Sequence, residues 1–244
     1  MRILVVNCNT SVAMTEEIAH IARCAARTGT EIVATQPGWG PASAEGYYDS
    51  FMSAAAVLEH LTSWPDPFDA VVMAGFGEHG REGARQLLDV PVVDITEAGV
   101  IVANLLGSRF GVVTTVESAI SQIEHSLLTA GLLQRCVGVV AADLRVLDAA
   151  TDRNVTVNAI AVRGRELLDR GADVLVLGCA GFAGLDRELE TLLGVPVVDC
   201  VAAAVSISES LVGLGKRTSK RGPYSPRHSD KAMVGRSSVI HTVQ

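Results

Sequence analysis

Residues 69–75, with the sequence DAVVMAG, and residues 173–179, with the sequence DVLVLGC, decide the fold because they repeat one pattern. Each stretch starts with an aspartate, continues as an apolar run of strand length and ends at a turn residue. A short helical pattern follows each stretch, and then comes the sequence PVVD, at residues 91–94 and 196–199. The matched order and spacing predict that one strand–helix–strand unit was duplicated within the chain.

Outside the two copies, short β-rich runs alternate with segments of helical periodicity as far as about residue 215. This alternation predicts an α/β fold with parallel strands and right-handed crossovers. We expect two pseudo-symmetric lobes, each a parallel four-stranded sheet flanked by helices. The expected strands are residues 3–6, 31–34, 70–74, 92–94, 110–114, 137–141, 174–177 and 197–199.

The two lobes and a tail are expected to divide the chain. Residues 1–98 together with 203–215 would form lobe one, and residues 99–202 would form lobe two. Open α/β sheets bind ligands beyond the carboxyl ends of their strands, so the active site is expected in the cleft between the lobes. Residues 216–244 mix basic residues with Ser, Gly and Pro. This composition predicts a solvated, flexible tail or, alternatively, an arm at a subunit interface.

Composition excludes several classes of function. The net charge of −7 argues against non-specific binding of nucleic acid. No apolar run reaches the roughly 20 residues of a membrane span, and the first apolar run is too short for a signal peptide. The five cysteines show no paired spacing, which indicates reduced thiols and a cytoplasmic protein. No CxxC motif or His/Cys cluster predicts a metal site.

Cys179 is the first candidate for a catalytic group. It directly follows a predicted strand and is expected to open a helix, where backbone N–H groups and the helix dipole favour a thiolate. Gly178 and Gly181, on either side of Cys179 and Ala180, allow a tight turn and the close approach of a ligand. A buried, inert cysteine is the alternative, and the position at a strand–helix junction favours the functional interpretation.

Two further turns are candidates for substrate binding. Residues 7–11 lie between the first strand and the first helix, and residues 114–115 form the corresponding turn in the second half. A hydroxyl in the first turn can simply cap the helix. Free backbone N–H groups of such a turn can also hold a carbonyl or enolate oxygen, and the two roles are compatible. The predicted contacts to that oxygen come from Asn7, Asn9, Thr10, Thr114 and Thr115, and Ser11 is a further predicted substrate-binding residue.

Six motifs, spread over residues 1 to about 224, resemble in their order and spacing those of the hydantoin and allantoin racemases in the aspartate/glutamate racemase superfamily. A loop in the second motif, with Tyr48, is expected to cover the cleft and contact the substrate. The motifs are residues 7–11 (NxNTS), 40–49 (GPxSxEGYYD), 113–115 (VTT), 178–181 (GCAG), 196–199 (PVVD) and 218–222 (TSKRG).

The resemblance implies a cofactor-free racemase or isomerase that acts at a carbon next to a carbonyl group. The substrate class that it implies is a small molecule, a 5-substituted hydantoin or allantoin. One cysteine thiolate removes the proton, and a second thiol returns one to the opposite face. Cys179 matches the second cysteine, and Phe76 matches the residue that follows the first. A homo-oligomer is also implied.

Gly75 stands where the family has its first cysteine, and the internal repeat pairs Gly75 with Cys179. Glycine carries no proton, so three interpretations remain open. Cys8, where the family usually has proline, could supply the missing thiol. Glu78 or His79 could act as the opposing base. Alternatively, one thiol suffices, as in arylmalonate decarboxylase, which the pattern of glycine then cysteine also resembles and in which loss of carbon dioxide generates the enolate.

Two other classes of protein fit parts of the sequence. Residues 75–80 match GxGxxG and Asp94 follows the next strand, as in the dinucleotide-binding fingerprint of an NAD-dependent oxidoreductase. The first strand–helix unit lacks these glycines, and the helix expected at residues 81–88 is short, which argues against that class. A ligand-binding protein that has lost its catalytic base is the third possibility.

Overall fold

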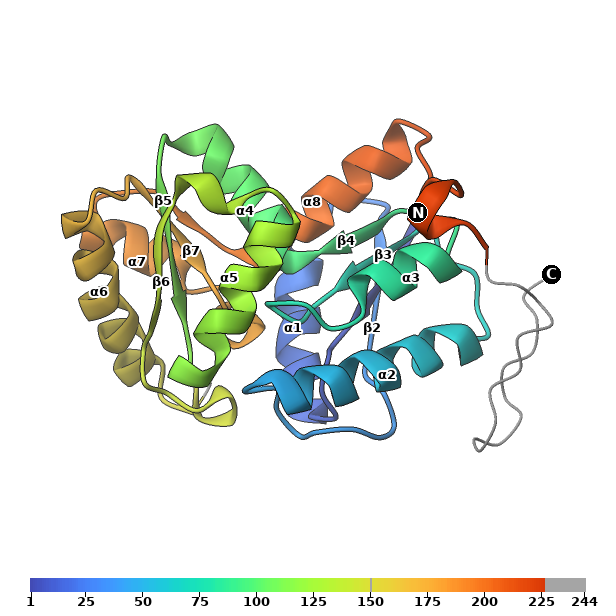
Figure 1. Cartoon of the computed structure of the whole chain (residues 1–244), viewed down its shortest axis with the longest axis horizontal. Coiled ribbons are helices and arrows are strands. Elements are labelled where there is room, and N and C mark those ends of the chain that lie inside the picture. The colour runs from blue at the N-terminus through green and yellow to red at the C-terminus, as the bar shows by residue number, and fades with distance from the viewer. Residues whose placement is uncertain (150, 227–244) are drawn as a thin grey trace.

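The computed structural model describes residues 1–149 and 151–226 and has the predicted two-lobed α/β architecture (Figure 1). Each lobe holds one parallel four-stranded sheet, in the order β2-β1-β3-β4 in lobe one and β6-β5-β7-β8 in lobe two. Because the order is the same, the two halves of the internal repeat adopt one topology. The strands are β1 (Arg2–Val6), β2 (Glu31–Thr35), β3 (Ala70–Met73), β4 (Val92–Asp94), β5 (Phe110–Thr114), β6 (Cys136–Ala141), β7 (Val174–Leu177) and β8 (Val197–Val198).

Helices cover the sheets because the central strands are apolar on both faces. All residues of β3, β5 and β7 are buried, so neither face of these strands can be left to solvent. Among the described residues, no helix is long and apolar enough to cross a membrane. The α-helices are α1 (Val12–Ala25), α2 (Tyr47–Ser63), α3 (Arg81–Leu87), α4 (Ile95–Leu106), α5 (Ile120–Thr129), α6 (Arg153–Asp169), α7 (Asp186–Leu193) and α8 (Cys200–Gly213).

Two helices cross between the lobes. Helix α4 continues from β4 but packs on β7 of lobe two, while α8 continues from β8 but packs on β3 and β4 of lobe one. The two helices also pack against each other, at the junction of the lobes (Figure 1). One buried apolar cluster therefore runs through both sheets, from Val5 and Val72 to Val112 and Val176. Because the two sheets share this core, the two lobes pack together around it.

The repeated PVVD sequence forms a strand and a helix cap in each lobe. Asp94 is the N-cap of α4, and Asp199 is the N-cap of α8. Each carboxylate accepts hydrogen bonds from two backbone N–H groups in the first turn of its helix. Such a cap contributes about 1 kcal/mol to stability. The repeated PVVD sequence thus marks where the chain leaves β4 and begins α4, and where it leaves β8 and begins α8.

The described part of the C-terminal segment, residues 216–226, is mostly exposed but contacts lobe one through the side chains of Thr218 and Lys220. The Lys220 ammonium donates hydrogen bonds to the carbonyl oxygens of Arg85, Gln86 and Leu88, at 2.7 to 3.1 Å, at the C-terminal end of α3. The Thr218 hydroxyl donates to the Val90 carbonyl oxygen. A cation satisfies the free carbonyl groups at a helix end, which explains the docking. The remainder of the predicted tail, residues 227–244, lies outside the described residues.

Candidate active site

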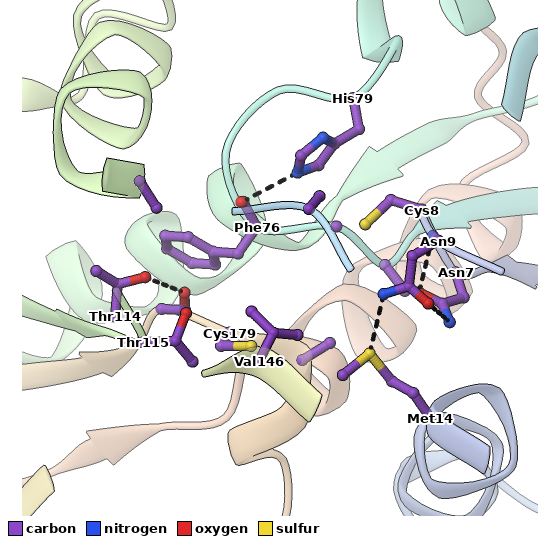
Figure 2. A pocket seen from close by; sticks show the side chains of 16 residues that line it. Asn7, Cys8, Asn9, Met14, Phe76, His79, Thr114, Thr115, Val146 and Cys179 are labelled. Atoms are coloured by element: carbon purple, nitrogen blue, oxygen red, sulfur yellow. Dashed lines mark hydrogen bonds between the residues drawn. The ribbon is translucent and has the colours of Figure 1, made fainter. Parts of the chain in front are cut away.

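Most of the predicted site residues line one pocket between the carboxyl ends of the two sheets (Figure 2). The cavity at its centre has a volume of about 30 Å³. Turns after β1 and β3 form the wall on the side of lobe one, and turns after β5 and β7 form the opposite wall. The lining residues are Asn7, Cys8, Asn9, Met14, Ala44, Ala74, Gly75, Phe76, His79, Thr114, Thr115, Ala119, Val146, Gly178, Cys179 and Ala180.

Cys179 lies at the end of β7, as predicted, but it does not open an α-helix. It caps a single 3-10 turn, η4 (Ala180–Phe182), and its sulfur accepts a hydrogen bond from the Gly181 N–H at 3.3 Å. The expected thiolate is corrected as well, because burial raises the pKa of Cys179 to about 11 despite this N–H group. Gly178 is required in this turn, since a Cβ atom there would lie 2.9 Å from the Val113 carbonyl oxygen.

Gly75 lies at the end of β3, in the position equivalent to Cys179, and neighbouring side chains fill the space beside it. A Cβ atom on Gly75 would lie 2.3 Å from His79 Cδ2, 2.7 Å from Cys8 Cβ and 2.8 Å from Cys8 Sγ. These separations are shorter than any normal contact between such atoms. Glycine is therefore needed here to make room for the thiol of Cys8 and the imidazole of His79.

Cys8 comes from the turn after β1, the strand that neighbours β3 in the sheet. Its side chain is buried and lines the pocket together with Cys179. Burial raises the pKa of Cys8 to about 12, and the electrostatic effect of Cys179 adds to this rise. The pocket therefore contains two thiols, one from each lobe, and burial keeps both in the protonated form near neutral pH.

The two predicted alternatives for the opposing base have different surroundings. His79 lines the pocket and is only 4% exposed, and burial lowers the pKa of its imidazole. Glu78 is not among the residues that line the pocket. Its carboxylate accepts hydrogen bonds from the N–H groups of Gly80 and Arg81, at 2.8 and 2.7 Å, and so caps the first turn of α3. Helix capping accounts for the acidic residue at this position.

In the turn after β1, Asn7 and Asn9 line the pocket but use most of their polar atoms within the turn. Asn7 Nδ2 donates to Asn9 Oδ1 at 2.9 Å and to the Thr15 hydroxyl at 3.1 Å. Asn9 Nδ2 points to the Met14 sulfur at 3.2 Å, which is a weak acceptor. Asn9 Nδ2 is therefore the amide group of this turn that is best able to exchange its partner for a substrate oxygen.

Ser11 has the capping role, Thr10 bonds to a neighbouring loop, and neither residue lines the pocket. The Ser11 hydroxyl accepts a hydrogen bond from the Met14 N–H and caps α1. The N–H and the hydroxyl of Thr10 both donate to the Pro41 carbonyl oxygen. The bonds of Thr10 anchor the loop that leads from β2 to α2, and this loop contributes Ala44 to the pocket.

The turn after β5 contributes both of the predicted threonines to the pocket. The Thr114 hydroxyl donates to the Gly178 carbonyl oxygen at 3.0 Å and so links the ends of β5 and β7. Thr115 is buried at the same wall. Of the remaining predicted contacts, Gly181 lines a separate groove beside α1, and Tyr48 is 77% exposed outside the pocket. Tyr48 is thus not a pocket residue in this conformation.

The pocket also contains residues that sequence reasoning missed. Ala44 comes from the loop before α2, and Val146 begins a 3-10 turn of lobe two, η3 (Val146–Asp148). Glu45 joins these two segments, because its carboxylate accepts the Val146 N–H at 3.0 Å. Its carbonyl oxygen also accepts the Ser118 hydroxyl of lobe two. No spacing in the sequence pairs residue 45 with residue 146. The other missed lining residues are Met14, Ala74 and Ala119.

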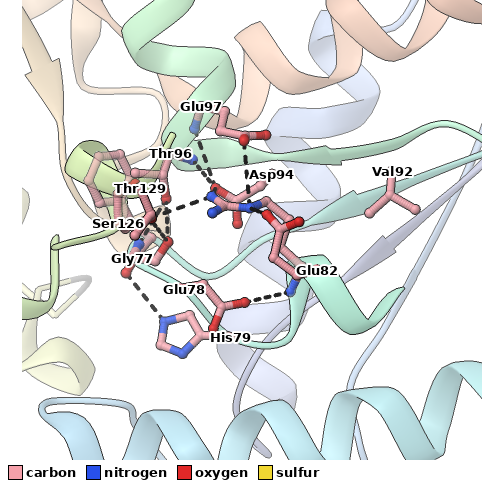
Figure 3. Close-up of polar contacts among 12 residues, drawn as sticks. Gly77, Glu78, His79, Glu82, Val92, Asp94, Thr96, Glu97, Ser126 and Thr129 are labelled. Carbon is pink, nitrogen blue, oxygen red and sulfur yellow. Dashed lines mark hydrogen bonds and ion pairs between the residues drawn. The ribbon is translucent and has the colours of Figure 1, made fainter. Parts of the chain in front are cut away.

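A buried polar network supports the loop that carries Gly75 and His79 (Figure 3). The Thr96 hydroxyl and the Ser126 hydroxyl both donate to the Gly77 carbonyl oxygen, at 3.0 and 2.8 Å. Behind them, the buried Arg81 guanidinium lies 3.7 Å from the Asp94 carboxylate. Asp94 is only 1% exposed and caps α4, so it is not placed to bind the ribose of a dinucleotide. Residues 75–80, which match GxGxxG, instead form the loop that this polar network supports.

Comparison with known proteins identifies relatives over most of the chain. Residues 3–207 match the family described as Asp/Glu/hydantoin racemase. A hydantoin racemase of Pseudomonas sp. (strain NS671) is 39% identical over 226 residues, which are 92% of this chain and 91% of that protein. The crystal structure of an allantoin racemase from Pseudomonas fluorescens superposes with a TM-score of 0.94 at 47% identity, over 96% of this chain and 100% of that chain. Arylmalonate decarboxylase matches at 20% identity with a TM-score of 0.60, over 92% of this chain and 97% of that chain, a likeness of fold alone.

Proposed function

We propose that this chain, which belongs to the Asp/Glu/hydantoin racemase family and is an isomerase, racemises 5-substituted hydantoins or allantoin with Cys8 and Cys179 as its two acid/base groups. The single observation that carries this assignment is the position of the Cys8 sulfur. It lies 2.8 Å from the point where a Cβ atom of residue 75 would be. The thiol that the strand end of β3 lacks is therefore supplied by the adjacent strand β1.

Two thiols on opposite walls of one pocket suit racemisation. In one direction, the Cys8 thiolate takes the proton from the substrate carbon, and the Cys179 thiol gives a proton to the opposite face. For the other enantiomer the roles are reversed. The enolate formed between the two steps carries negative charge on its oxygen, and N–H donors held in place stabilise such charge. Asn9 Nδ2 and the backbone of the turns after β1 and β5 are the donors that we assign to this oxygen.

The presence of a second thiol weakens the one-thiol alternative. A decarboxylase needs one protonating thiol, since loss of carbon dioxide forms its enolate without a base. Here glycine at position 75 does not leave the space beside it empty, because Cys8 and His79 fill it. The second thiol of a two-base racemase is thus still available, from a different residue.

Both thiols must be reduced for this chemistry, and all five cysteines within the described residues are free. We therefore propose that the protein works in a reducing compartment, the cytoplasm. The homo-oligomer implied by the family resemblance is part of the same proposal. Analytical ultracentrifugation of the purified protein tests the oligomer, which a single monomeric species would exclude.

The test follows each enantiomer of allantoin and of several 5-substituted hydantoins in deuterated water. Circular dichroism reports the enantiomer ratio, and NMR reports the proton on the reacting carbon, with enzyme-free controls because hydantoins racemise spontaneously. We expect deuterium to enter with inversion from both enantiomers. Cys8→Ala and Cys179→Ala should each lower racemisation by at least about 100-fold, the usual contribution of one acid/base group.

Cys24→Ala is the matched control, because Cys24 is exposed and lies outside the pocket. It should racemise as fast as the wild type. Full activity of Cys8→Ala would contradict the assignment of the second thiol while leaving the isomerase intact. Absence of exchange at the carbon with all of these substrates would contradict the substrate class.

A further inference from the structure

His79 is a buried histidine in the pocket that the two-thiol mechanism does not use. Its Nε2 atom lies 3.3 Å from the Phe76 carbonyl oxygen. Its Nδ1 atom has no hydrogen-bond partner among the described residues, although the side chain is only 4% exposed. An unsatisfied buried polar atom costs about 1 to 3 kcal/mol, so its presence at a functional site calls for an explanation.

The imidazole and the Cys8 thiol meet in the space that glycine leaves at position 75. His79 Cδ2 lies 2.3 Å from the Cβ position of Gly75, and Cys8 Sγ lies 2.8 Å from the same point. Figure 2 shows both side chains on the wall of lobe one, across the pocket from Cys179. The ring edge that contains Cδ2 is therefore the edge nearest the thiol.

A half turn of the ring about the Cβ–Cγ bond exchanges the places of Cδ2 and Nδ1. The two orientations fill the same volume, because a histidine ring has nearly the same shape after this turn. In the turned orientation, Nδ1 takes the place of Cδ2 beside Cys8, and Cε1 replaces Nε2 near the Phe76 carbonyl oxygen. The pairing thus needs no movement of the backbone, only a rotation of one side chain.

We infer that His79 is the proton partner of Cys8 and prepares its thiolate for catalysis. This inference rests on the proposed role of Cys8. In this step the S–H bond of Cys8 breaks as an N–H bond forms at His79 Nδ1, which leaves a thiolate beside an imidazolium. Cys8 then takes the proton of the substrate carbon, and Cys179 gives its own proton to the opposite face. The proton on His79 leaves to solvent, and Cys179 is reprotonated, when the pocket opens.

Electrostatics favour an internal transfer over the loss of a proton from Cys8 alone. A single thiolate in a buried pocket is costly, whereas a thiolate next to an imidazolium forms an ion pair with no net charge. The other ionisable groups that act on this pair are Glu78, which favours the imidazolium, and Cys179 and Asp94, which oppose the thiolate. Burial lowers the pKa of His79, so the imidazole is neutral before the transfer, and the ion pair with the thiolate must offset this lowering.

The two thiols should respond differently to a change at His79. The Cys179 sulfur accepts a hydrogen bond from the Gly181 N–H, and His79 lies on the opposite wall of the pocket. A change at His79 should therefore affect the exchange reaction that starts from Cys8 and spare the one that starts from Cys179. A residue that merely supports the fold would affect both reactions equally.

The experiment introduces His79→Asn into two single-thiol proteins, Cys179→Ala and Cys8→Ala, and measures deuterium entry into each enantiomer of the substrate. Asparagine keeps a polar atom at the δ position but cannot take the proton. We expect exchange in the Cys179→Ala protein to fall by about 100-fold or more, and exchange in the Cys8→Ala protein to change by less than about twofold. Equal losses in both proteins would overturn the inference, as would full retention of the Cys8 reaction.

A second measurement needs no substrate and separates this inference from the proposed function. The rate of alkylation of Cys8 by iodoacetamide is measured against pH in the Cys179→Ala protein, with the modified peptide identified by mass spectrometry. With His79 present, Cys8 should react at lower pH than in the His79→Asn variant, by about one pH unit or more. Coincident pH profiles in folded proteins would overturn the pairing, even if hydantoins and allantoin are not substrates.

Discussion

The ends of β3 and β7 are equivalent positions in two copies of one unit, yet they are built differently. At the end of β7, Cys179 carries the thiol in the repeated position itself. At the end of β3, Gly75 carries none, and we propose that Cys8, from the turn after the neighbouring strand β1, supplies the thiol instead. On that proposal, the two thiols keep equivalent places in the pocket although their places in the sequence differ, because adjacent parallel strands end at one edge of a sheet.

The aspartates of the two PVVD sequences, Asp94 and Asp199, also have different surroundings in the two lobes. Asp199 caps α8 and also accepts the Gly184 N–H at 2.7 Å through its second oxygen. Asp94 caps α4, but its second oxygen has no hydrogen-bond partner among the described residues, and its charge is balanced by the buried Arg81. Burial raises the pKa of Asp94, and Arg81 opposes that rise. Lobe one therefore relies on a buried ion pair where lobe two relies on a backbone N–H.

Removal of that ion pair should have the largest effect on stability. Arg81→Met leaves the Asp94 carboxylate buried without its cation and should lower the free energy of unfolding by about 3 to 5 kcal/mol. Urea denaturation measures the change. The control is Arg153→Met, which breaks an exposed ion pair with Glu188 and should cost less than about 1 kcal/mol. Equal losses of stability from the two changes would show that the buried pair of Arg81 and Asp94 contributes no more than an exposed pair.

A cysteine at position 75, the position that is equivalent to Cys179, should have the next largest effect on stability. Gly75→Cys places a Cβ atom within 3 Å of Cys8 and His79 and should cost about 1 to 3 kcal/mol through overpacking. Adding Cys8→Ala removes the nearby sulfur and should recover part of that stability and, with the new thiol, part of the racemisation. Gly38→Ala, a glycine with open space around it, is the control and should be nearly neutral.

The raised pKa values of Cys8 (about 12) and Cys179 (about 11) predict a loss of stability in alkali. Both exceed the ordinary value of 9.0, so the folded protein holds these protons more tightly than the unfolded chain. Stability should therefore fall as the pH rises above 9, by about 1.4 kcal/mol per pH unit for each thiol, until the folded pKa is reached. Urea denaturation between pH 8.5 and 10.5 tests this, and Cys8→Ala should flatten the slope, whereas Cys24→Ala should leave it unchanged.

The smallest effect is expected at the contact that closes the pocket between the lobes. Glu45→Ala removes the acceptor for the Val146 N–H and should raise the KM by roughly fivefold, equal to about 1 kcal/mol for one hydrogen bond. Glu45→Gln keeps an acceptor oxygen at the same place and should leave the KM close to that of the wild type. If both variants behave alike, the negative charge of Glu45, rather than the hydrogen bond, would hold the lobes together.

The sequence alone was sufficient for the α/β class, the two lobes and the position of Cys179. Alternating periodicity reports which residues are buried, and the repeated DxxxxxG/C and PVVD stretches mark where strands end and helices begin. The same local signals placed Cys8, His79 and the residues of the turns after β1 and β5 near the cleft. They also gave an α-helix after Cys179 that is only one 3-10 turn, and a thiolate that burial disfavours.

Only the tertiary structure decided which of the candidate side chains share the space beside Gly75. The sequence left Cys8, Glu78, His79 and a one-thiol reaction open, because spacing along a chain does not fix which side chains from different strands share one volume. Packing in lobe one brings Cys8 and His79 to the space beside Gly75, whereas the backbone of α3 engages Glu78. The contact between Glu45 and Val146 is likewise a product of packing between lobes, since 101 positions separate the two residues.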